Sequence, residues 1–113
     1  MELLYVYDEY KKINKELVEY LNNILSNEEG LNSNSNIDKT INRFIDSLEK
    51  IKNNADSIEL TNSNNQNLND LKYLIVSTLF LLGDLEHFYR INELTRFKMR
   101  AVNYINHARR SGK

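Results

Sequence analysis

The chain has 113 residues, with no proline, no cysteine, no tryptophan and only three glycines. Proline and glycine are the residues that most disfavour helix, so their scarcity lets the backbone run helical over long stretches. Without cysteine there is no disulfide framework, thiolate metal site or catalytic thiol, and nothing points to an oxidising compartment. At this length the chain fits one domain, residues 1–113, that can bury a modest core without such crosslinks.

No secretory leader or membrane span is predicted. The first residues carry no basic region ahead of an apolar run. The longest apolar run, residues 73–82, is far shorter than the roughly 20 residues that a membrane-crossing helix needs. We therefore expect a cytoplasmic, intracellular protein.

Apolar residues recur at alternating spacings of three and four along two segments, which we predict to be helices over residues 2–26 and 37–59. The first stripe comprises Leu3, Val6, Tyr10, Ile13, Leu17, Tyr20 and Ile24. The second comprises Ile37, Ile41, Phe44, Leu48, Ile51, Ala55 and Ile58. This period is typical of amphipathic helices that pack along a seam, and it favours an antiparallel pair.

Polar segments rich in asparagine and serine, near residues 27–36 and 60–66, are predicted to be flexible loops. Their short polar side chains compete for backbone hydrogen bonds and so interrupt helices. Asn36 and Asn67 are the predicted N-caps of the helices that follow these loops.

Two further helices are predicted over residues 67–90 and 93–110. The first contains the apolar run 73–82, which we expect its neighbours to cover on several sides. A turn near Asn92 would make the two helices a hairpin; without glycine or proline there, one long helix is the alternative. The predicted fold is an all-α, four-helix, mostly antiparallel bundle.

Charge is unevenly distributed along the chain, although the formal net charge is only -1. Residues 1–60 hold 12 acids and 7 bases, whereas residues 90–113 hold seven bases and one acid. The basic end could attract an acidic or phosphate-bearing partner, or it could lie against the acidic first half of its own bundle. The candidate binding residues on this basic face are Arg96, Lys98, Arg100, His107, Arg109 and Arg110.

No constellation for metal binding, cofactor binding or nucleophilic catalysis is visible. His87 lies near Asp84 and Glu86, but these positions diverge on a helix, whereas two ligands of one ion need spacings of three or four. We expect His87 to be half-buried in a packed helix. Three isolated glycines cannot form a phosphate-binding loop.

Arg100 and His107 are seven residues apart, which places them two turns apart on one side of a helix. This pair resembles the arginine-histidine motif of small helical HEPN ribonucleases. The resemblance implies His107 near a scissile phosphate, with Arg100 stabilising its charge. Position 101 departs from the motif, because it is alanine where a polar residue often follows the arginine.

Residues 68–112 show a second resemblance. The stretch from Leu74 to Phe88, with its Leu82-Gly83-Asp84 element and the later Ala101, looks like the helical hairpin of 14-3-3-like, tetratricopeptide-related domains. Such hairpins occur in telomerase-associated and nonsense-mediated-decay adaptors. The resemblance implies that Gly83 lets a neighbouring helix approach closely. It also implies a phosphoserine-binding basic residue in the region that here holds His87 and Arg90.

The absence of a catalytic constellation favours a non-catalytic protein-protein interaction module, such as an adaptor, a chaperone-like partner or an immunity or inhibitor protein. Its partner would be another protein, acidic or phosphorylated; nucleic acid is conceivable but not favoured. A small HEPN-like ribonuclease using Arg100 and His107 is one alternative. A self-associating coiled coil, and with it a homo-oligomer, is another.

Overall fold

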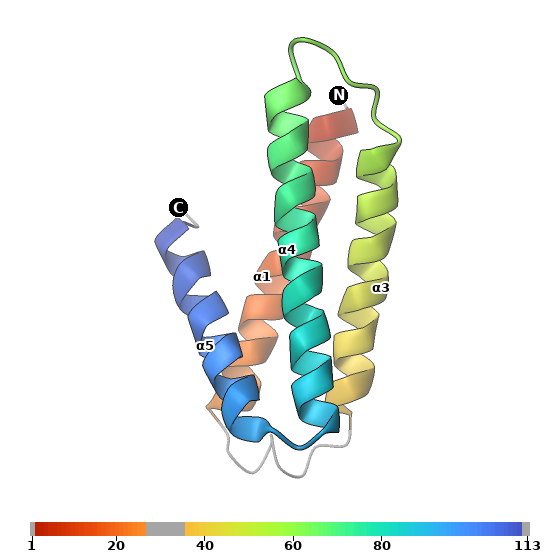
Figure 1. The fold of residues 1–113 in the computed structure, drawn as a ribbon. Coiled ribbons are helices and arrows are strands. Elements are labelled where there is room, and N and C mark those ends of the chain that lie inside the picture. Colours follow the sequence, from red (N-terminus) through yellow and green to blue (C-terminus); the bar gives the residue numbers. More distant parts are fainter. Residues whose placement is uncertain (1, 27–35, 112–113) are drawn as a thin grey trace.

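The computed structural model describes residues 2–26 and 36–111 and shows four helices in an up-and-down arrangement (Figure 1). The helices are α1 (Glu2–Leu25), α3 (Ile37–Asp56), α4 (Asn65–Arg90) and α5 (Leu94–Ser111). The predicted all-α, four-helix, antiparallel bundle is confirmed, with bounds that differ from the prediction by a few residues at most. The loop predicted over residues 27–36 lies outside the described residues, apart from Asn36.

The core forms where one apolar stripe from each helix meets the others. α3 packs against α1 and α4, and α5 packs against α4 and α1. Completely buried side chains come from all four helices: Leu17 and Leu21, Ile41 and Leu48, Ile75 and Leu82, and Phe97 and Ala101. Burial of each large aliphatic or aromatic side chain contributes about 1.5–3 kcal/mol, so these stripes hold the bundle together.

One face of α4 is exposed, contrary to the expectation that neighbours cover residues 73–82 on several sides. The side chains of Tyr73 and Phe80 are 72% and 69% exposed, and Leu74 is 38% exposed. α4 occupies one corner of the bundle and packs mainly against α3 and α5, so its outer face remains in solvent.

α4 begins two residues earlier than predicted, and its N-cap is Asn64, not Asn67. The side chains of Thr61 and Asn64 stabilise this earlier start. The Thr61 amide donates to Asn64 Oδ1 at 2.8 Å, and the Asn64 amide donates to Thr61 Oγ1 at 3.2 Å. The predicted N-cap at Asn36 is confirmed as a position, although its side chain makes no capping hydrogen bond.

A tight turn between α4 and α5 confirms the predicted hairpin. The Glu93 amide donates to the Phe88 carbonyl at 2.8 Å, and the Asn92 amide donates to the Tyr89 carbonyl at 3.1 Å. This pair of bonds is the Schellman pattern, which needs a left-handed residue after the helix end. Asn92 supplies it with a φ of 63°. Asparagine adopts this conformation more readily than most residues, so the turn needs no glycine.

We expect Asn92→Ala to lower the free energy of unfolding by about 1 kcal/mol, because an alanine Cβ is disfavoured at positive φ. Asn92→Gly should leave stability unchanged or raise it slightly. Urea denaturation followed by circular dichroism checks both variants. Equal stability of the two would show that the turn does not require a left-handed residue.

Gly83 does not serve a close approach of helices, which is the role that the adaptor resemblance implies for it. It lies on the exposed surface of α4, and a Cβ built on it meets no atom within 4 Å. At this position, glycine therefore only increases the conformational entropy that the chain loses when α4 folds.

Gly83→Ala should accordingly raise the free energy of unfolding by about 0.5–1 kcal/mol, since alanine is the better helix former and the site has room for it. The midpoint of urea denaturation reports this change. A lower midpoint than that of the wild type would contradict the open surroundings of Gly83.

Candidate functional site

α5 diverges from α1 and α4 toward its C-terminal end and leaves an open groove between the three helices (Figure 1). α5 has 18 residues against 26 in α4. At 1.5 Å per residue, α5 is therefore roughly 12 Å shorter than α4. The groove has a volume of about 1050 Å³. Among the described residues, it is a candidate site for a ligand or partner.

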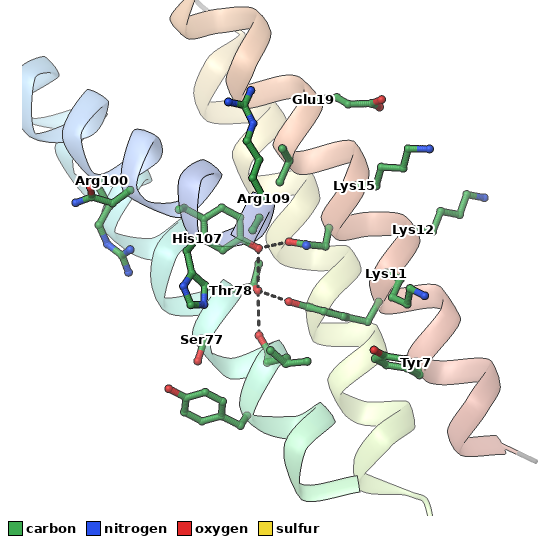
Figure 2. A pocket seen from close by; sticks show the side chains of 18 residues that line it. Tyr7, Lys11, Lys12, Lys15, Glu19, Ser77, Thr78, Arg100, His107 and Arg109 are labelled. Atoms are coloured by element: carbon green, nitrogen blue, oxygen red, sulfur yellow. Dashed lines mark hydrogen bonds between the residues drawn. The ribbon is translucent and has the colours of Figure 1, made fainter. Parts of the chain in front are cut away.

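Basic side chains line this groove from two helices. They are Lys11, Lys12 and Lys15 of α1 and Arg100, His107 and Arg109 of α5, against the single acid Glu19. Figure 2 shows Lys12 and Lys15 extending away from the floor of the groove into solvent, so they form its outer margin. The lining is thus strongly positive although the whole chain is nearly neutral.

Among residues 2–26 and 36–111, no ion pair joins Lys11, Lys12, Lys15 or Arg109 to a carboxylate. The Arg100 Nε lies 3.1 Å from Asp84 Oδ2 on α4. The Lys11 ammonium instead lies 5.4 Å from the centre of the Tyr7 ring. Among residues 2–26 and 36–111, no ion pair joins α5 to α1 or α3. α5 therefore lies against α1 of the acidic first half without an ion pair between described residues of the two helices.

The groove brings together only part of the predicted basic face. Arg100, His107 and Arg109 line it, whereas Arg96, Lys98 and Arg110 do not. The Arg96 Nε instead lies 3.4 Å from Oε1 of Glu93, which directly precedes α5. The sequence analysis missed the lysines of α1, because the first 60 residues are acidic as a whole. The signal that could have revealed them is the spacing of Lys11 and Lys15, which are four residues apart on one helix face.

The floor of the groove is a network of hydroxyl groups that joins three helices (Figure 2). Thr78 Oγ1 of α4 donates to the Leu74 carbonyl and contacts the Tyr10 hydroxyl of α1, each at 2.9 Å. The Tyr104 hydroxyl of α5 lies 3.3 Å from Thr78 Oγ1 and donates to Asn14 Oδ1 of α1. These polar groups satisfy one another, so the floor offers a ligand mainly shape and apolar surface.

Burial raises the pKa of both tyrosines in this network above the ordinary value of 10.0. For Tyr104, the nearby Tyr10 raises the pKa further, and the hydrogen bond with Thr78 lowers it less than burial raises it. Both phenols are therefore protonated at neutral pH, and neither is a nucleophile or general base there.

His87 is exposed on α4, contrary to the expectation that it is half-buried. Its position near the C-terminal end of α4 is on an outward face of the hairpin. Nearby Arg90 pairs with Glu86 at 3.1 Å. In the part of the chain that the structure describes, no three His, Cys, Asp or Glu side chains are grouped as metal ligands would be.

Comparison of the chain with protein-family models, curated proteins and solved structures finds no match. Within residues 2–26 and 36–111, no helix combines the length and hydrophobicity that a membrane crossing requires.

The hydroxyl network should make stability fall at alkaline pH. The folded-state pKa values of Tyr10 and Tyr104 lie above their unfolded values, so their contribution is complete below about pH 10 and is lost as pH rises through the folded values. Tyr104→Phe removes the bond to Asn14 and should cost about 1 kcal/mol at pH 7. It should also weaken the alkaline decline. Urea denaturation at pH 7 and above pH 10 measures both effects.

Tyr73→Phe is the matched control, because Tyr73 is 72% exposed. Its stability and pH dependence should follow those of the wild type. A Tyr104→Phe variant with the stability and alkaline decline of this control would exclude a structural role for the network.

Proposed function

We propose that this protein is a non-catalytic, helical interaction module that binds an acidic segment of another protein in the groove between α1, α4 and α5. The observation that carries the proposal is a set of groove cations that form no ion pair within the described part of the chain: Lys11, Lys12, Lys15 and Arg109. Cations that surround a concave surface attract acidic segments and speed their association. An intracellular location and an adaptor, chaperone-like or inhibitor role belong to the same proposal.

A groove that holds a small polar ligand usually presents a few convergent hydrogen-bonding groups. Here the hydroxyls of Tyr10, Thr78 and Tyr104 bond to one another or to groups of the bundle. The long side chains at the margin, Lys11, Lys12 and Lys15, are exposed. This arrangement suits a partner segment that contacts apolar walls and pairs its charges at the edge.

A helical ribonuclease is the second candidate, because Arg100 and His107 both line the groove. However, the Arg100 guanidinium already bonds to a carboxylate, Asp84, which competes with a phosphate for the same donor. The groove also holds further cations that this mechanism leaves without a role. We therefore favour binding over phosphodiester cleavage.

Charge reversal in the groove should abolish acidic-segment binding. We expect Lys11→Glu/Lys15→Glu/Arg109→Glu to weaken binding of fluorescein-labelled poly-L-glutamate by at least about tenfold at low salt, as measured by fluorescence anisotropy. The matched control is Lys39→Glu/Arg43→Glu/Lys50→Glu, which makes the same charge change on exposed residues of α3. This control should retain most of the affinity.

Equal losses in the two variants would show that net charge alone drives binding, and would contradict a groove site.

A parallel incubation with labelled single-stranded RNA in chelator addresses the second candidate. RNA cleavage by the wild type that His107→Ala removes would overturn the proposal in favour of the ribonuclease.

A further inference from the structure

The wide end of the groove lacks the fourth helix that the rest of the bundle has. Toward the first turns of α1 and α4, α5 leans away and ends (Figure 1). Side chains that a fourth helix would cover are open there: Tyr7 is 40% exposed and Leu74 is 38% exposed. Both residues line the groove. We call this region the open corner, defined by Tyr7, Lys11, Leu74 and Arg109.

We infer that the acidic segment is an amphipathic helix that lies in the open corner between α1 and α4 and completes the bundle there. This inference rests on the proposed function, since it names the kind of partner that the same groove receives. The partner helix would present an apolar stripe to Tyr7 and Leu74. Its acidic residues, at the edges of that stripe, would pair with Lys11 and Arg109.

The dimensions of the groove suit a short helix. Its lining runs along α1 from Tyr7 to Glu19, a rise of roughly 18 Å, which matches a helix of about 12 to 13 residues. A helix about 10 Å wide fills about 120 Å³ per residue. The volume of about 1050 Å³ therefore holds most of such a helix, with one face left in solvent.

The surrounding secondary structure also favours a helix over an extended peptide. Every regular element among the described residues is a helix, so an extended peptide finds there no sheet edge on which to add a strand. Helices pack against helices by fitting side chains between ridges, and α1 and α4 both line the groove as helices, with the side chains of Tyr7, Val18 and Leu74 available for such packing.

Single-stranded nucleic acid fits the open corner less well. Such ligands bind by stacking bases on free aromatic faces next to cations. The ring of Tyr7 already has the Lys11 ammonium over it, 5.4 Å from its centre. The other side chains available near the floor include aliphatic ones, Val18, Leu74 and Ala108. Aliphatic side chains suit the leucine-like stripe of an amphipathic helix.

The test uses a labelled 14-residue peptide with leucines on one helical stripe and glutamates flanking it, and a scrambled peptide of the same composition without the stripe. The full-length protein should bind the amphipathic peptide at least about tenfold more tightly than the scrambled one. Circular dichroism of the mixture should show a gain in helicity on binding. Binding of the two peptides with equal affinity would overturn the helix inference.

Leu74→Asn should weaken binding of the amphipathic peptide by about tenfold, because it places a polar group in the apolar wall. Phe80→Asn is the matched control, since Phe80 is 69% exposed on α4 and does not line the groove. Loss of peptide binding in both variants alike would contradict the open corner as the site.

Failure of this inference is separable from failure of the proposed function. If charge reversal abolishes poly-L-glutamate binding while the amphipathic and scrambled peptides bind equally, the groove binds acidic segments but not a helix.

Light scattering and competition provide two further checks. A stable dimer that Leu74→Asn dissociates would make a second copy of the chain the occupant and overturn the inference. Displacement of the peptide by single-stranded RNA at lower concentration would overturn it in favour of nucleic acid.

Discussion

The position of α5 depends on the hydroxyl network in which Tyr10, Thr78 and Tyr104 meet. It connects α1, α4 and α5 at the floor of the groove, beneath which the helices pack through Leu17, Phe97 and other buried side chains. Buried polar groups specify one arrangement because any displacement that leaves a hydroxyl without a partner is costly. The network therefore favours one position of α5 against α1 and α4.

The like charges of the groove cations lower stability slightly, and no ion pair within residues 2–26 and 36–111 compensates for those of Lys12, Lys15 and Arg109. Lys11 and Lys15, four residues apart on α1, repel each other by a few tenths of a kcal/mol. Arg109 of α5 lines the same groove and adds charge of the same sign. Natural proteins commonly tolerate such local costs where a surface serves binding. An acidic partner would turn each of these repulsions into an attraction.

Much of the fold could be predicted from the sequence, because the apolar period alone identifies helices and the faces they bury. Details that depend on single residues could not. The turn near Asn92 could be predicted, but the left-handed conformation through which this residue ends α4 could not. Asn64 occupies the N-cap position of α4 without a side-chain capping bond, and several other asparagines surround it in the sequence. Propensity cannot choose among them, since the choice depends on local hydrogen bonds.

The site was less predictable than the fold. Arg100, His107 and Arg109 could be found from the basic end of the chain, but their partner residues could not. Lys11 and Lys15 lie about ninety residues earlier, within an acidic half whose average charge conceals one basic helix face. The groove also depends on how far α5 diverges from α1, a tertiary property with no sequence period.

The Arg100–Asp84 pair shows how the groove can keep a second binding arginine beside Arg109 without burying charge. Arg100 and Asp84 have side chains 36% and 52% exposed, and ion pairs at such exposure contribute about 0–1 kcal/mol. A carboxylate of a bound partner can therefore replace Asp84 at little cost. In the unbound protein, Asp84 holds the Arg100 guanidinium between α4 and α5. An exchange of one carboxylate for another keeps Arg100 satisfied in both states, which suits reversible binding of an acidic segment better than activation of a scissile phosphate.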